Sequence, residues 1–149
     1  MKNTNKLILL FSFIIISIGV SNAQEIGIRG GALSGGNIAL DAVISTGEFS
    51  RIHADVSFGE DIGIDIIWDF IYLPLGDETL YIYAGIGPYM LFSEPVTIGA
   101  AGEIGFEYRF DSVPIALGVD WRPLLSITEE TEFIPKGYGL NIRYILDFY

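Results

Sequence analysis

Histidine, aspartate and serine alternate in the segment RIHADVSFGE, residues 51–60. His53, Asp55 and Ser57 have the side-chain types of a hydrolytic triad, in which a base activates a serine hydroxyl. Residues i and i+2 of a strand, however, lie about 7 Å apart on one face. That gap is too long for a proton relay along a single strand. The spacing therefore favours three members of one polar strand face over a catalytic triad.

Two other segments carry groups that could bind an ion. The stretch TEETEF offers the carboxylates of Glu129, Glu130 and Glu132 to a divalent cation, but it lacks the glycine-turned ligand order of a calcium loop. RGGALSGG is rich in glycine, yet neither a helix pattern nor a GK[ST] element follows it, as phosphate binding requires. His53 is the single histidine of the chain, so a multi-histidine metal site is excluded. We expect no catalytic residue, no cofactor and no metal.

The residues around His53 alternate with the period of a β-strand. Arg51, His53, Asp55 and Ser57 would form a polar face, opposite an apolar face of Ile52, Ala54, Val56 and Phe58. The same alternation, bounded by turn signals such as SGG, TGE and PLGDE, predicts strands at residues 25–33, 37–45, 50–59, 62–73, 79–92, 98–110, 114–125 and 137–148. Eight strands of this length are typical of a small transmembrane barrel.

The predicted polar faces collect charges of both signs, whereas the apolar faces carry none. Arginine suits enclosed, bidentate pairing with carboxylates better than lysine does, and glycines on the same faces would leave room for Tyr81, Tyr83 and Tyr89 in a narrow lumen. We therefore predict that the polar faces point inward. The predicted lumen charge network comprises Arg29, Asp41, Arg51, His53, Asp55, Asp65, Asp69, Glu103, Glu107, Arg109, Asp120, Arg122 and Arg143.

The outward faces would then meet lipid. Candidates for the aromatic girdles at its two surfaces are Trp68, Tyr72, Phe110, Trp121, Tyr144 and Phe148. The alternative is a soluble periplasmic barrel or lipocalin-like cup with its apolar faces inside. Such a cup would leave the arginine-rich faces in water without a reason, so the membrane barrel is the preferred interpretation.

The first 23 residues have the pattern of a secretory signal peptide. Lys2 and Lys6 precede the apolar run LILLFSFIIISIGV, and Ser21 and Ala23 occupy the small positions of a cleavage site. The run is short for a membrane-spanning helix and no stop-transfer cluster follows it. We thus expect residues 1–23 to be removed and residues 24–149 to form the barrel.

Composition limits the partners of the remaining chain. Without Lys2 and Lys6 it would keep six of its eight basic residues against 19 acidic ones, a net charge of −13. Nucleic-acid binding is disfavoured, because little positive charge is left to meet phosphates. The absence of cysteine excludes disulfides and a lipid-anchored lipoprotein.

The last predicted strand, GYGLNIRYILDF, resembles the closing strand of small outer-membrane barrels. In that resemblance Leu140, Ile142, Tyr144, Leu146 and the terminal aromatic Phe148 correspond to the signal read by the barrel assembly machinery, with Tyr149 one residue beyond it. YIYAGIGPY, GFEYRF and LGVDWRP are similar to segments of the porin-like barrels widespread in Bacteroidetes and spirochaetes, which share the architecture of the transmembrane domain of outer membrane protein A. The resemblance covers residues 50 to 149 and implies fold and location.

These observations predict an all-β protein, an eight-stranded antiparallel up-and-down transmembrane barrel in the cell outer membrane of a Gram-negative envelope. We expect a monomer that contacts outer-membrane lipids and the assembly machinery, with both chain ends in the periplasm and the breaks near 34–36, 60–61, 93–97 and 126–136 outside. Three functions stay open: a structural envelope barrel with a largely plugged lumen, a narrow porin-like channel for ions or small solutes, and a lipid-modifying enzyme. The leading expectation is the structural, non-enzymatic barrel, since eight strands leave an interior just filled by side chains.

Overall fold

The computed structural model describes residues 24–76, 79–128 and 130–146, and the predicted signal peptide and Phe148 lie outside these residues. The described chain is built from β-strands. They are Glu25–Gly31 (β1), Ile38–Gly47 (β2), Ser50–Phe58 (β3), Ile62–Pro74 (β4), Leu80–Phe92 (β5), Thr97–Arg109 (β6), Ile115–Trp121 (β7), Leu124–Ser126 (β8), Glu132–Ile134 (β9) and Tyr138–Ile145 (β10). Among the described residues no helix is long and apolar enough to cross a membrane.

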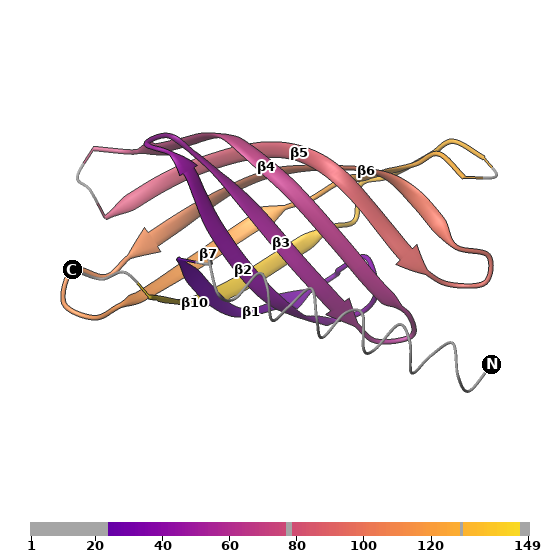
Figure 1. The fold of residues 1–149 in the computed structure, drawn as a ribbon, viewed down its shortest axis with the longest axis horizontal. Coiled ribbons are helices and arrows are strands. Elements are labelled where there is room, and N and C mark those ends of the chain that lie inside the picture. Colours follow the sequence, from indigo (N-terminus) through magenta and orange to yellow (C-terminus); the bar gives the residue numbers. More distant parts are fainter. Residues whose placement is uncertain (1–23, 77–78, 129, 147–149) are drawn as a thin grey trace.

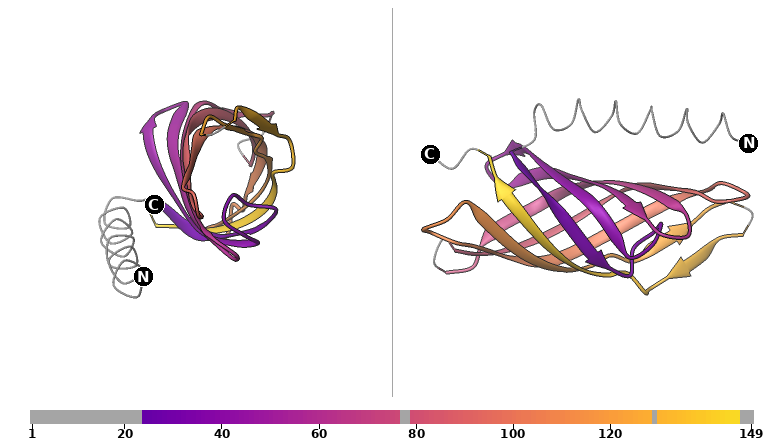
Figure 2. Two further views of the ribbon diagram at one scale, coloured as in Figure 1. Left: turned by 90° about the vertical axis from the view of Figure 1, so that its right-hand side faces the viewer. Right: turned by 90° about the horizontal axis from the view of Figure 1, so that it is seen from below.

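The strands close into a barrel. Each strand from β1 to β6 pairs antiparallel with the next, β7 pairs with β10, and β10 returns to β1, so β1–β7 and β10 form a ring without a free edge. The ring is seen end-on in Figure 2, and the tilt of its strands is seen from the side in Figure 1. The predicted all-β class and the closed eight-stranded antiparallel barrel are therefore confirmed.

Side-chain exposure alternates along the strands with the polar residues inside. On β10 the outward residues Leu140, Ile142 and Tyr144 are exposed, whereas Asn141 and Arg143 between them are buried. The outward positions of β1–β7 and β10 carry no charged side chain within the described chain. This arrangement inverts that of a soluble sheet protein, where the apolar face is buried.

One predicted facing is wrong because β4 contains an irregularity. The register of β4 against β5 shifts between Asp69 and Ile71, which is the signature of a β-bulge. Past the bulge both Phe70 and Ile71 face outward, and Tyr72 turns into the lumen instead of joining an outer girdle.

The predicted break at residues 126–136 contains further strand structure. β7 ends at Trp121, since Pro123 has no N–H to donate to a ladder. β8 resumes the pairing with β6 in the same register and then pairs with β9, which extends one wall of the barrel. Glu132, expected in a loop, lies in β9. Three residues of EFI are too few for periodicity to reveal a strand.

The two ends of the described chain meet at one end of the barrel. The Leu146 N–H donates to the Gln24 carbonyl at 2.7 Å, which places the start of β1 beside the end of β10. The connections 32–37, 59–61 and 93–96 lie at the opposite end, together with the β8–β9 hairpin (Figure 1). We call the first end the terminal end and the second the hairpin end.

Candidate functional site

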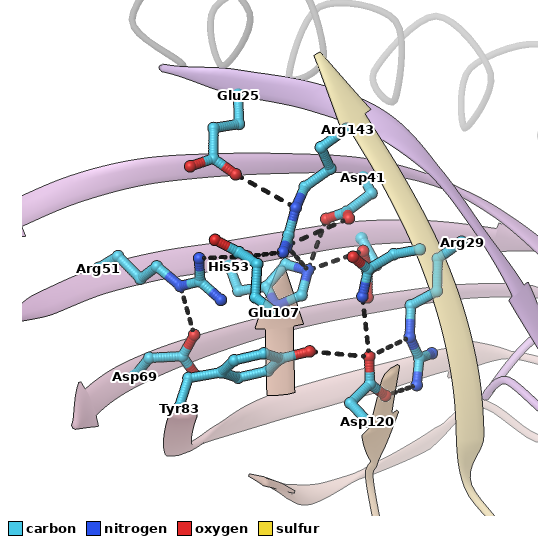
Figure 3. A network of polar contacts seen from close by, with 12 residues as sticks. Glu25, Arg29, Asp41, Arg51, His53, Asp69, Tyr83, Glu107, Asp120 and Arg143 are labelled. Atoms are coloured by element: carbon cyan, nitrogen blue, oxygen red, sulfur yellow. Dashed lines mark hydrogen bonds and ion pairs between the residues drawn. The ribbon is translucent and has the colours of Figure 1, made fainter. Parts of the chain in front are cut away.

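The barrel interior holds a network of buried ion pairs, drawn in part in Figure 3. Arg51, Arg122 and His53 are among its basic residues, and their side chains are at most 3% exposed. The structure places all thirteen residues of the predicted network inside the lumen, twelve of them buried and Arg109 partly exposed. Within the described chain five guanidiniums face eight carboxylates, those of Glu25, Asp41, Asp55, Asp65, Asp69, Glu103, Glu107 and Asp120.

Arg122 joins three carboxylates near the hairpin end. Its Nη1 donates to Asp55 and, at 3.1 Å, to Asp65 Oδ2, while Nη2 donates to Glu103 Oε1 at 2.7 Å. Asp55 and Asp65 are cross-strand partners on β3 and β4, so the guanidinium bridges two like charges that would otherwise repel. Arg122 thereby ties β3, β4 and β6 to the end of β7.

His53 lies between carboxylates from two sides. Its Nε2 is 2.5 Å from Asp41 Oδ1 and its Nδ1 is 3.1 Å from Glu103 Oε1. A carboxylate accepts hydrogen bonds and donates none when ionised, so this arrangement suits an imidazole with a proton on both nitrogens. Arg122 and Arg143 stand 3.5 and 3.4 Å from the same ring. The histidine is therefore enclosed by two carboxylates and two guanidiniums of the network.

Glu107 is the centre of the network near the terminal end. It accepts hydrogen bonds from Arg143, from Arg51 Nη1 at 2.9 Å, and from the Tyr72 hydroxyl at 2.8 Å. Tyr72 also stacks on Tyr81, with ring centroids 4.7 Å apart. Side chains from β3, β4 and β10 thus meet at one carboxylate of β6.

Glu25 is a member of this group that the sequence analysis missed. Its carboxylate accepts from Arg109 Nη1 at 2.6 Å and lies 3.2 Å from Arg143 Nε. Glu25 has the same parity on β1 as the predicted lumen residue Arg29, and that parity was the available signal.

Arg109 does not pair with Asp120 and lies apart from it along the barrel. The register of β6 and β7 sets Arg109 opposite Ala116, whereas Asp120 lies opposite Gly105. Arg109 is consequently near the terminal end, where it pairs with Glu25 and Glu107.

Asp120 binds partners from strands on both sides of β7. It accepts both prongs of the Arg29 guanidinium, the Asn141 amide at 3.2 Å and the Tyr83 hydroxyl at 3.4 Å (Figure 3). Tyr83 is fully buried and carries the Arg51 guanidinium over its ring, 4.6 Å from the centroid. The Tyr83 side chain therefore connects the Arg29–Asp120 pair with the ion pairs of Arg51.

Inward glycines make room for these large groups. A methyl group at Gly105 would overlap the Tyr83 phenol and lie 2.7 Å from the Val119 carbonyl oxygen, and one at Gly139 would overlap the Arg29 guanidinium. Gly105 on β6 and Gly139 on β10 must therefore have no side chain, so that the Tyr83 and Arg29 side chains can extend into the lumen.

The triad-like residues do not form a triad. His53 Nε2 does approach Asp55 Oδ1 to 3.7 Å, closer than the spacing along one strand predicted, because the two side chains converge inside the curved wall. Ser57, however, accepts from the Gly35 N–H at 2.8 Å and lies 3.1 Å from the Ser34 hydroxyl. Its hydroxyl thus anchors the 32–37 connection, and RGGALSGG packs against the barrel wall.

Two groups in the lumen have side chains close enough to share a metal ion. They are Asp41, His53 and Asp55, and His53, Asp69 and Glu103, and the ligand atoms of each lie within 4.8 Å of one another. Arg143 and Arg122 already pair with these carboxylates. A cation there would have to displace guanidiniums, so the groups are organised as ion pairs.

Two pockets open at opposite ends of the network. The pocket at the terminal end has a volume of about 360 Å³ and includes Glu25, Arg51, Tyr72 and Arg109 in its lining. The pocket at the hairpin end has a volume of about 430 Å³, and no described residue lines both pockets. The ion pairs and Tyr83 occupy the space between them.

The residues of the predicted assembly signal are outside the lumen. Leu140, Ile142, Tyr144 and Leu146 are exposed on the outer face of the barrel at and after β10. Trp68, Trp121 and Tyr144 also face outward, as predicted for girdle residues, and Phe110 follows β6.

Fold and lumen together define a closed eight-stranded barrel with an apolar outer surface and a charged interior. No family model matches the chain, and neither a curated protein nor a solved structure matches it.

Proposed function

We propose that this protein is an integral outer-membrane barrel whose lumen is closed by its own ion pairs and whose role is structural. The observation that carries the proposal is the inverted distribution of side chains. Leu140, Ile104 and Trp68 are 69%, 44% and 54% exposed, whereas Asp69 and Glu107 are fully buried. In water, a belt of exposed apolar side chains around the whole barrel would cause the molecules to aggregate, whereas in a membrane these side chains would contact lipid tails.

Membrane insertion is tested by fractionation and by folding in lipid. We expect the protein to remain in the outer-membrane fraction after a carbonate wash and to migrate differently on a gel before and after boiling. A protein that stays in the soluble periplasmic fraction without detergent would refute the proposal.

Closure of the lumen rests on the network. Arg122 and Tyr83 are at most 3% exposed, and Arg122, at the end of β7, pairs with Asp55 on β3, the strand on the opposite side of the ring. Charges enclosed in this way are costly unless paired, so the pairs hold the side chains across the lumen. The proposal includes no enzymatic step, since the Ser57 hydroxyl contacts Ser34 and Gly35.

Planar-bilayer recording tests closure. We expect no unitary conductance from the wild-type protein, and openings from Arg122→Ala, because this change releases Asp55, Asp65 and Glu103 from a shared cation. Steady conductance of the wild type would favour the second candidate, a narrow channel. Eight lumen carboxylates against five guanidiniums and one imidazole predict that such a channel would select cations.

A further inference from the structure

The pocket at the hairpin end differs in chemistry from the rest of the lumen. Beneath it Ile67, Tyr89 and Ala101 form a buried apolar cluster, against which Leu91 and Leu124 pack. The pocket is further lined by Leu33 and Ile134 among others. Inward positions that carry charges elsewhere in the barrel are thus apolar here, and the network does not use this space.

Hydroxyl groups stand among these apolar walls. Tyr89 is 3% exposed, and its hydroxyl, near Ser126, makes no hydrogen bond of standard geometry within the described part of the chain. A buried polar atom without a partner is uncommon, because it loses its contact with water and gains nothing in return. Ser34 and Ser126 line the same pocket, and Ser34 donates to Asp65 at 2.9 Å. The hydroxyl groups at the floor of the pocket, those of Tyr89, Ser34 and Ser126, can therefore hydrogen-bond a bound small molecule, the guest of the pocket.

The charges around the pocket favour a cation. Glu130 and Glu132 line it together with one base, Lys136. Below the floor, carboxylates outnumber the cations of the lumen network. Low-dielectric walls between two negative regions concentrate their field in the space that they enclose.

We propose that this outer pocket binds a small amphipathic molecule in which a basic amine is joined to an apolar body. The apolar body packs against Leu33, Leu91 and Leu124, and the ammonium group lies toward Glu130 and Glu132. The Tyr89 hydroxyl supplies a hydrogen bond to a polar atom of the guest. A volume of about 430 Å³ is within the range of small-molecule sites. The site is independent of lumen closure, since it lies on one side of the ion pairs.

A matched series of three probes tests the charge preference. 2-Phenylethylamine, 2-phenylethanol and 3-phenylpropionate share an aromatic body and differ in charge. Titrations would follow the methyl resonances of Leu91 and Leu124 in full-length protein reconstituted in lipid nanodiscs. We expect saturable shifts with affinity falling from amine to alcohol to carboxylate. Shifts that do not saturate, or equal affinity for amine and carboxylate, would overturn the proposal.

Variants separate the pocket from the general negative field. Glu130→Gln with Glu132→Gln should weaken amine binding about two- to tenfold, the effect of two exposed ion pairs, and leave the alcohol unchanged. Glu60→Gln with Asp61→Asn removes the same charge at the same end of the barrel outside the pocket lining, and should change neither. If both double variants lost the same affinity for the amine, the effect would come from the overall negative charge of this end of the barrel, and the proposed site would be refuted.

A third variant tests the floor. Tyr89→Phe should weaken both amine and alcohol, because it removes a hydroxyl and leaves the apolar walls. Folding of every variant is verified by its heat-dependent gel migration. Unchanged affinity for both probes in folded Tyr89→Phe would contradict the assigned position of the guest.

Discussion

The carboxylate of Asp120 on β7 accepts both prongs of the Arg29 guanidinium from β1, across the intervening strand β10. The two residues are 91 positions apart in the chain and are both buried. A bidentate pair of this kind is stronger and more directional than a single hydrogen bond. The pair therefore spans the seam between β1 and β10, which closes the barrel, and stabilises it.

Removing one partner of this pair should cost more than removing both. Asp120→Leu leaves a buried guanidinium without its carboxylate, a loss of about 3–5 kcal/mol in the free energy of unfolding. The double variant Arg29→Met with Asp120→Leu should recover a large part of that loss. Equilibrium unfolding in lipid vesicles would measure both, and additive losses would contradict a coupled pair.

Gly105 and Gly102 provide a matched test of lumen packing on one strand. Alanine at Gly105 would overlap the Tyr83 phenol, whereas at Gly102 its methyl group would be 3.7 Å from the Pro123 ring, an ordinary contact. We expect Gly105→Ala to lower stability by about 1–3 kcal/mol, the cost of overpacking, and Gly102→Ala to be neutral. Adding Tyr83→Leu should relieve Gly105→Ala, and the absence of such relief would assign the loss to the backbone.

The outward face of β6 should not tolerate charge. Ile104 is 44% exposed, and we predict that Ile104→Arg costs about 2–4 kcal/mol if it lies near the bilayer midplane. Ile127, beyond the end of β8, is the control position, where arginine should cost about 0–1 kcal/mol. Vesicle unfolding titrations would compare the two variants. Equal and small effects, in a protein that is soluble without detergent, would support a periplasmic barrel.

Orientation in the membrane can be read from single cysteines, because the chain has none of its own. Thr131 lies in the hairpin between β8 and β9, and Ser112 lies between β6 and β7 at the terminal end; both are exposed. On intact cells, a membrane-impermeant maleimide should label Thr131→Cys and spare Ser112→Cys until the cells are opened. Labelling of Ser112→Cys alone would place the chain ends outside.

The sequence determined which residues face the lumen wherever a strand is regular. Alternation is a property of each strand by itself, so the inward positions of Asp55, Asp65 and Arg143 follow from the period of two without knowledge of any neighbour. The turn signals likewise placed the ends of β2 to β6 to within two residues, although β7 ends four residues earlier than predicted. The absence of charge from the apolar strand faces predicted that these faces point outward, the reverse of a soluble barrel.

Only the tertiary structure decided which partners meet. Arg109 lies with Glu25 and not with Asp120, because the stagger of β6 and β7 sets the height of every side chain in the lumen. The bulge after Asp69 places Tyr72 inside the lumen, and the alternation of residues along β4 did not predict this bulge. The apolar pocket around Tyr89 arises in the same way, from side chains on separate strands that a closed ring brings to one level. Whether a side chain points inward depends on its own strand, whereas its position along the barrel axis and its neighbours in the lumen depend on the register of all strands in the ring.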